Sequence, residues 1–192
     1  MAGVTADRIL DSAQAMMQTR GYHDVSYRDI ADEIGIKTAS IHYHFPSKTD
    51  LGVALTARYR ERFFDDLAHT VKREKSALHA LKGFAALFRQ VMADNHFCLC
   101  GALGSEVGGL PTAVVDEVAS FFAACEDWLA ESFASGRANG ALGFTGSPKV
   151  QASVFLSLME GALLTSRSLG GLKRFDAIVK TFLEGLRPTA RA

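Results

Sequence analysis

The fold is decided by residues 26–51, which read Ser-Tyr-Arg-Asp-Ile-Ala-Asp-Glu-Ile-Gly-Ile-Lys-Thr-Ala-Ser-Ile-His-Tyr-His-Phe-Pro-Ser-Lys-Thr-Asp-Leu. Ser26 is suited to cap a helix, because its side chain can accept a hydrogen bond from a backbone N–H of the first turn. Ile30 and Ile34 lie four residues apart and therefore share one face of that helix. Gly35 then supplies the permissive backbone that a tight turn requires. The pattern predicts a short helix that ends at a turn.

A second short helix is predicted directly after this turn, over about residues 37–43. It must end by Phe45, because Pro46 cannot continue the helical hydrogen bonds and disfavours helical geometry in the residue before it. Only Ile41 clearly points toward a core, so the outer face is small and polar. Two such helices form a helix-turn-helix, which holds its second helix against base edges in the major groove of DNA.

A third helix is predicted to begin at Ser47. Its cap partner is Asp50, three residues on, in a short form of the capping box that also puts a carboxylate at the positive end of the helix. Lys48 is left at this N-terminus, where it can pair with a DNA phosphate beside the backbone N–H groups of the first turn.

At these positions the sequence resembles the tetracycline-repressor (TetR) family of one-component transcriptional regulators. Ala39 stands where the family's usual glycine begins the recognition helix, and His42 stands where a tyrosine is common, with Tyr43 beside it. The resemblance covers about the first 60 residues. It is carried by Ile9, Ala13 and Met16 of a first helix, Gly21-Tyr22, Arg28-Asp29-Ile30-Ala31, His44-Phe45-Pro46-Ser47-Lys48 and Leu51.

The resemblance implies an all-α fold with about nine helices. An N-terminal three-helix helix-turn-helix DNA-binding domain would occupy residues 1–50, and a larger helical effector-binding and dimerisation domain residues 51–192. It further implies a repressor that binds a palindromic operator as a homodimer and releases it on binding an unknown small-molecule effector. The residues predicted to contact double-stranded DNA are Ser26, Tyr27, Arg28, Lys37, Thr38, Ala39, Ser40, His42, Tyr43, His44 and Lys48.

Length and composition agree with this prediction. A chain of 192 residues that is 48% hydrophobic can bury one sizeable core and a small satellite. It has no uncharged apolar run of about 18 residues, so we expect no membrane span. The first ten residues include Asp7 and Arg8 and lack an apolar run, so we expect no signal peptide and a cytoplasmic protein. Three cysteines, an odd number, do not make a disulfide framework.

The net charge is zero, which is unusual for a DNA-binding protein. The DNA affinity must then come from the placement of charge: Arg28, Lys37 and Lys48 toward DNA, the acids turned away, and helix N-termini adding positive potential. We expect a modest salt dependence, with about four to eight phosphate contacts per dimer and a slope of about −0.9 for each.

The rest of the chain is predicted to be helical. Apolar residues at spacing four, from Leu51 to Leu67, predict one long helix that leaves the DNA-binding domain. Two further stripes include Leu78, Leu81, Ala85, Phe88 and Met92, and Val114, Val118, Phe121, Cys125 and Trp128. Four glycines and a proline then predict a loop, at Gly136, Gly140, Gly143, Gly146 and Pro148.

The last two predicted helices, over residues 150–169 and 175–186, are broadly apolar. Gly161 and Ala162 would let a neighbouring helix approach closely. The two helices either complete the core of one subunit or form a four-helix bundle with the same pair from a second subunit. We favour the dimer, because a helix-turn-helix usually reads two half-sites.

The middle of the chain is richer in large apolar side chains than a tight bundle of this size needs. It either packs without a cavity or lines an apolar pocket for the effector, and Glu106, Glu160 and Arg167 would be polar groups beside it. The resemblance favours the pocket. The predicted ligand-binding residues are Met92, Phe97, Cys98, Phe121, Phe122, Cys125, Trp128, Phe155 and Met159.

The cluster around Cys98 and Cys100 admits three interpretations: a metal site with too few ligands, a thiol sensor of oxidants or electrophiles, or packing. Some branches of the family have a similar Cys-x-x-Gly turn, matched by Cys98 and Gly101. The alternative function is therefore a cysteine-based redox-sensing or electrophile-sensing repressor. No metal or cofactor is predicted, and the absence of nucleophile-elbow, phosphate-loop and zinc-protease motifs argues against an enzyme.

Overall fold

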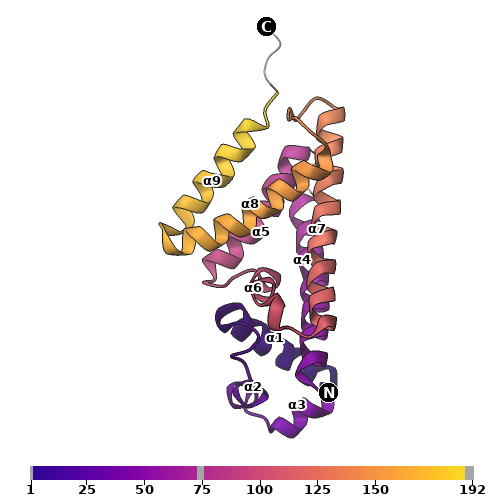
Figure 1. The fold of residues 1–192 in the computed structure, drawn as a ribbon, viewed down its shortest axis with the longest axis vertical. Helices are drawn as coiled ribbons and strands as arrows, with labels where there is room; N and C mark the ends of the chain where they lie inside the picture. Colours follow the sequence, from indigo (N-terminus) through magenta and orange to yellow (C-terminus); the bar gives the residue numbers. More distant parts are fainter. Residues whose placement is uncertain (1, 73–75, 189–192) are drawn as a thin grey trace. The chain divides into compact units, whose positions relative to one another are not determined.

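The computed structural model describes residues 2–72 and 76–188 (Figure 1). Over these residues the chain forms nine α-helices, one short 3-10 helix and no strand, which confirms the all-α fold. None of the helices in the described part of the chain is long and apolar enough to cross a bilayer. The helices are α1 (Ala2–Arg20), α2 (Tyr27–Ile34), α3 (Thr38–His44), α4 (Lys48–Val71), α5 (Ala77–Ala93), α6 (Leu99–Ser105), the 3-10 helix η1 (Val107–Gly109), α7 (Thr112–Ala138), α8 (Pro148–Ser168) and α9 (Gly171–Gly185).

Packing divides the chain into two compact units. The first unit comprises residues 1–62 and 96–121, and the second comprises residues 63–95 and 122–192. The long helices α4 and α7 each contribute to both units. A segment far along the chain, which holds α6 and η1, therefore packs with the first 62 residues. The functional boundary at residue 50 stays a prediction.

The helix-turn-helix forms from local signals. The Ser26 hydroxyl accepts a hydrogen bond from the Asp29 N–H at 3.2 Å, and the Asp29 carboxylate accepts one from the Ser26 N–H at 2.8 Å, so the capping box is complete. Gly35 ends α2 in the left-handed region, with φ 69° and ψ 41°. Phe45 ends α3 by donating its N–H to the Ile41 carbonyl at 2.8 Å. Each of these predicted boundaries is confirmed within one residue.

The first unit is held by a small core in which α1 packs against α2, α3 and α6. Ile9, Ile30, Ile41, Leu51 and Leu55 are fully buried. The isoleucines of the two short helices thus anchor them on their inner side. Their opposite sides are left for solvent or a partner.

The second unit is a bundle in which α5, α8 and α9 pack on one another. Its core is aromatic: Phe84 stacks on Phe88 with ring centroids 5.4 Å apart, and Phe155 stacks on Phe182 at 5.0 Å. Phe133 meets Phe155 edge to face at 6.2 Å. Such contacts stabilise a bundle beyond the burial of apolar area alone.

One loop prediction is wrong in part. Gly136 lies inside α7, which continues to Ala138, because this glycine serves close packing and not a turn. A Cβ atom at Gly136 would lie 2.4 Å from Leu142 Cδ1 and 2.6 Å from Ala77 Cβ. The loop begins after α7 and includes Gly140 and Gly146, which both have positive φ.

Candidate nucleic-acid interface

The outer face of α3 presents most of the predicted base-contacting side chains. Ile41 is fully buried and fixes which side of this short helix faces inward. Tyr43 is 81% exposed. Of the predicted residues in α3 and its N-cap, Ser40 and His44 are half-buried, and the exposed ones are Lys37, Thr38, Ala39, His42 and Tyr43.

Tyr27 has an internal role at this surface. Its hydroxyl donates a hydrogen bond to the Phe45 carbonyl at 2.8 Å, and its ring lies 4.7 Å from the ring of His42. Burial raises the pKa of Tyr27 to about 12, with the negative charge of Asp50 adding to the shift. The Tyr27 hydroxyl therefore keeps its proton and fixes the C-terminal end of α3 through this hydrogen bond. Tyr43 is the exposed tyrosine of α3.

Two serine caps of the same kind border the surface. Ser47 donates its N–H to the Asp50 carboxylate at 2.9 Å, and the Asp50 N–H donates back to the Ser47 hydroxyl at 3.2 Å, as predicted. Hydrogen bonds from the Ser26 hydroxyl and N–H hold the pKa of Asp29 below its ordinary value. Ser26 therefore shapes the start of α2, since its hydroxyl is already bonded within the cap.

The basic side chains of the interface differ in how tightly they are held. Arg28 is exposed and lies 3.8 Å from Asp32 on the same helix, and Lys37 is exposed. Lys48 donates from Nζ to the His23 carbonyl at 3.3 Å and lies 4.5 Å above the centroid of the Tyr22 ring. Burial lowers the pKa of Lys48, and Glu106 is the first of the carboxylates that oppose this shift.

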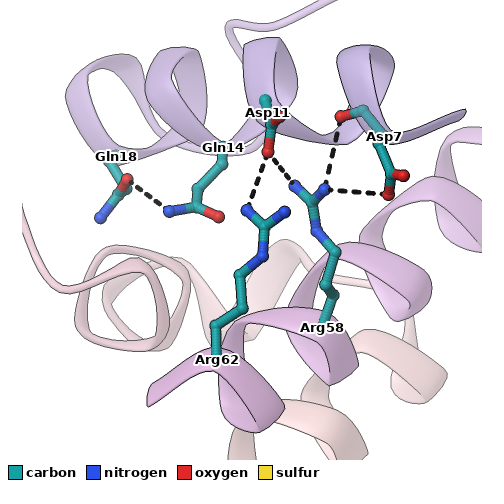
Figure 2. Close-up of polar contacts among 6 residues, drawn as sticks. All are labelled: Asp7, Asp11, Gln14, Gln18, Arg58 and Arg62. Atoms are coloured by element: carbon teal, nitrogen blue, oxygen red, sulfur yellow. Dashed lines mark hydrogen bonds and ion pairs between the residues drawn. The ribbon is translucent and has the colours of Figure 1, made fainter. Parts of the chain in front are cut away.

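A polar network joins α1 to α4 (Figure 2). Arg58 lies 2.9 Å from Asp11 and 3.6 Å from Asp7, and Arg62 donates to the same Asp11 carboxylate oxygen at 2.8 Å. Burial, followed by the charge of Arg62, lowers the pKa of Arg58. Sequence reasoning missed this network. Its signal was an acid pair and a basic pair, each spaced four residues apart on its helix.

Glu106 also differs from its predicted place beside a ligand. It follows α6 directly, and its carboxylate accepts hydrogen bonds from the backbone N–H groups of Tyr22 at 2.9 Å and His23 at 3.2 Å. The carboxylate thus contacts the turn that leads from α1 to α2.

The predicted ligand-binding residues are divided between the two units. In the first unit, the Tyr59 hydroxyl lies 3.7 Å from Cys98 Sγ, and its ring lies 5.5 Å from Phe121. In the second unit, Trp128 and Phe155 both lie against Phe84, at 5.9 and 6.1 Å. Phe97 belongs to the first unit, and the second unit also holds Met92, Phe122, Cys125 and Met159.

Two hollows of the second unit are lined by none of the predicted ligand-binding residues. A groove of about 400 Å³ lies between α5 and α9, over Ala85, Phe175 and Leu183, with Ala86 at its edge. Arg89 bridges it by donating two hydrogen bonds to Asp176, at 2.7 and 3.1 Å, and this pairing raises the pKa of Arg89. A hollow of about 460 Å³ lies over α8 and α9, lined by Leu158, Arg174, Ala177, Ile178, Thr181 and Phe182.

The three cysteines are buried, and no disulfide joins them. Burial raises the pKa of Cys125 far above its ordinary value. The predicted Cys-x-x-Gly turn is wrong: Cys98 is the N-cap of α6, and Gly101 lies within that helix. The described residues include no group of three or more His, Cys, Asp and Glu side chains placed to hold a metal ion.

Comparison with known proteins gives consistent results. A sequence model described as "Bacterial regulatory proteins, tetR family" matches residues 9–55. The chain is 30% identical over 156 residues to the transcriptional regulator AcuR of Cereibacter sphaeroides, covering 77% of this chain and 69% of AcuR.

The chain is also 40% identical over 45 residues to IcaR, an HTH-type negative transcriptional regulator of a biofilm operon in Staphylococcus aureus. This match covers 23% of this chain and 24% of IcaR. The fold is similar to the crystal structure of a TetR-family regulator from Agrobacterium tumefaciens, with a TM-score of 0.93 and 36% identity. That match covers 98% of this chain and 100% of the other.

Proposed function

Since the chain belongs to the TetR family of bacterial transcriptional regulators, we propose that it binds a palindromic operator as a homodimer and releases it when a small-molecule effector binds. The observation that carries the proposal is the exposed polar face of α3, set between the capped starts of α2 and α4. The proposal assigns no catalytic step to the chain. It also implies a cytoplasmic protein, because a chromosomal operator lies there.

The exposed side chains of α3 read base edges in this proposal. Thr38 begins the helix, and His42 and Tyr43 stand one turn further on. A helix of this kind enters the major groove with its N-terminal residues on the bases. Substituting Thr38 should therefore change which sequences are bound.

Phosphate contacts come from the neighbouring helix ends. Lys48 is the first residue of α4, where the helix dipole favours an anion. A phosphate contact carries no sequence information. Lys48→Ala should thus weaken binding to all duplexes about equally and reduce the salt slope by about 0.9 per subunit.

The second subunit is proposed to meet α8 and α9. The outer side of α8 exposes Val150, Val154 and Leu164, with exposed fractions of 61%, 47% and 59%. Gly161 lies between the last two, with nothing within 4 Å of where its Cβ would be. Exposed apolar side chains in a row mark an association surface.

Charging this surface tests the dimer. Val154→Glu with Leu164→Glu should leave a folded subunit that sediments as a monomer and loses operator affinity, because one half-site alone binds weakly. Phe182 is a poor choice for such a test, since its ring stacks on the buried Phe155 within the subunit. Val4→Glu, at an exposed valine of α1, is the control and should stay dimeric. A double variant that remains a dimer at micromolar concentration would refute the assignment.

The effector has two candidate sites in the subunit. Besides the predicted residues, the groove between α5 and α9 has a volume within the range of small-molecule sites. Ala86→Trp would fill this groove from its exposed edge. An effector that still releases DNA from this variant binds elsewhere.

The thiol-sensing alternative gains no support. Cys98 and Cys100 are 1% and 0% exposed, whereas sensor cysteines are accessible to their oxidant. A Cys98→Ser, Cys100→Ser double variant should therefore respond to the effector as the wild type does.

The experiment that tests the whole proposal is a selection of bound genomic fragments, followed by footprinting. A single short palindrome protected on two successive major grooves is the expected result. Repression is proposed because IcaR, which resembles the first part of the chain, is a negative regulator. A reporter gene behind the selected operator should be less active when the protein is present.

A further inference from the structure

Glu106 contacts a turn from which it is separated by more than eighty residues of sequence. Its two carboxylate oxygens accept one hydrogen bond each, Oε1 from the Tyr22 N–H at 2.9 Å and Oε2 from the His23 N–H at 3.2 Å. The side chain is 25% exposed. Charge-assisted bonds of this kind to backbone N–H groups are among the stronger hydrogen bonds in proteins.

The surrounding backbone is shaped for this contact. Gly21 has φ +85°, and a Cβ there would lie 2.0 Å from Glu106 Oε1. Gly109 leaves room in the same way for the His23 ring, whose Nε2 would lie 2.8 Å from an added Cβ. Two glycines thus let the carboxylate and the turn approach closely.

The same turn holds Lys48. The His23 carbonyl accepts the hydrogen bond from Lys48 Nζ, and the Tyr22 ring lies beneath that ammonium. Tyr22 is 4% exposed, so its ring is fixed by packing. The Glu106 carboxylate therefore binds the backbone N–H groups of Tyr22 and His23. The same two residues hold Lys48, through the Tyr22 ring and the His23 carbonyl.

A second contact secures the segment that carries Glu106. Gln18 donates from Nε2 to the Phe97 carbonyl at 2.7 Å, and the Phe97 N–H donates to the Gln18 carbonyl at 3.2 Å. The segment from Phe97 to Glu106, which includes α6, is therefore attached to α1 near its start and to the following turn at its end. All of these residues lie in the first unit.

We propose that Glu106 is a positioning residue for DNA binding: it fixes the turn at Gly21–His23 and thereby holds Lys48 where its ammonium meets a phosphate. The inference rests on the proposed phosphate contact of Lys48. A lysine ordered in advance loses less side-chain entropy on binding. A displacement of the C-terminal end of α6 would then move the turn at Gly21–His23, and the turn would move Lys48 relative to the phosphate.

The charge and the positioning of Glu106 act on DNA affinity with opposite signs. A carboxylate close to the duplex repels phosphate, so removal of the charge alone would strengthen binding. Loosening the turn at Gly21–His23 would weaken DNA binding. The two effects separate because only the positioning effect requires Lys48.

A double-mutant cycle with Lys48→Ala and Glu106→Gln, in the full-length chain, tests the proposal on a mixed-sequence duplex. Glutamine removes the charge and offers only one acceptor oxygen in place of two. Glu106→Gln should weaken binding about three- to tenfold when Lys48 is present. It should cause no weakening in the Lys48→Ala background. Glu117→Gln is the matched control, since Glu117 is equally half-buried in the same unit but pairs with Arg60 at 3.1 Å.

The outcomes distinguish the two levels of the proposal. Equal weakening by Glu106→Gln in both backgrounds, or no weakening in either, would overturn the positioning role while the phosphate contact stands. An unchanged affinity and salt slope in Lys48→Ala alone would overturn the phosphate contact itself. Thermal unfolding of each variant shows whether a loss of affinity reflects a loss of folded protein. If Glu117→Gln lowers DNA affinity as much as Glu106→Gln does, the specific role of Glu106 is also refuted.

Discussion

The helix-turn-helix segment and the predicted effector residues behave differently between sequence and structure. The predicted DNA contacts lie on consecutive short elements of one unit, and most of their side chains are exposed. The predicted effector residues lie in two units, and most of their side chains are buried. A binding surface consists of side chains, and their chemical types can be read directly from the sequence. A pocket is a space that side chains leave open, and no residue in the sequence marks it.

Phe155→Ala is expected to give the largest effect and could break this comparison. The ring is fully buried and contacts Phe84, Phe133 and Phe182, so its loss should lower the free energy of unfolding by about 3–5 kcal/mol. Urea denaturation measures the change, and Phe155→Leu should cost less. A loss below about 1 kcal/mol would instead indicate that the ring borders a void, as an effector pocket requires.

Ser26→Ala and Ser47→Ala should each lower the free energy of unfolding by about 1 kcal/mol. Each serine caps its helix through the same pair of hydrogen bonds with an aspartate three residues on. Asparagine at either position can cap in the same way and should restore most of the loss. If alanine costs nothing at either site, then packing and not capping sets where these helices begin.

Tyr43→Ala should separate stability from recognition. An 81% exposed side chain makes few contacts, so the free energy of unfolding should change by no more than about 0.5 kcal/mol. DNA affinity should nevertheless fall, because the ring stands on the outer face of α3. Titration of wild type and variant with one selected duplex measures this. Unchanged affinity would remove Tyr43 from the interface.

The smallest expected effect concerns the pH dependence of the first cap. The folded state holds the pKa of Asp29 below its ordinary value of 3.8, so the unfolded chain takes up this proton at higher pH. The stabilisation by the Asp29 carboxylate is therefore complete above pH 3.8 and is lost as the pH falls through the lower, folded pKa. An NMR titration should show the Asp29 pKa rising toward 3.8 in Ser26→Ala. An unchanged pKa would show that Ser26 does not cause the shift.

The predictable features were those with local causes. Ser26, Gly35 and Pro46 act on their own backbone or on a neighbour within one turn, so the helix boundaries near them followed from the sequence. The predicted loop position of Gly136 is wrong because the close approach of Leu142 and Ala77, which requires a glycine here, is a tertiary contact. Glu106 was misplaced for the same cause, since its partners lie more than eighty residues away and are backbone groups that every sequence contains.

Gly161 has a consequence for how the protein responds to its own abundance. A glycine within a helix costs about 1 kcal/mol relative to alanine, and nothing in the subunit occupies the space beside this one. The isolated subunit is therefore less stable than the same chain with alanine at this position. If the partner helix fills that space, the loss is recovered only on association, and folded protein becomes a function of total concentration. Newly made chains at low copy number would then be the ones most exposed to proteolysis, which sets a lower limit on the amount of regulator that can persist.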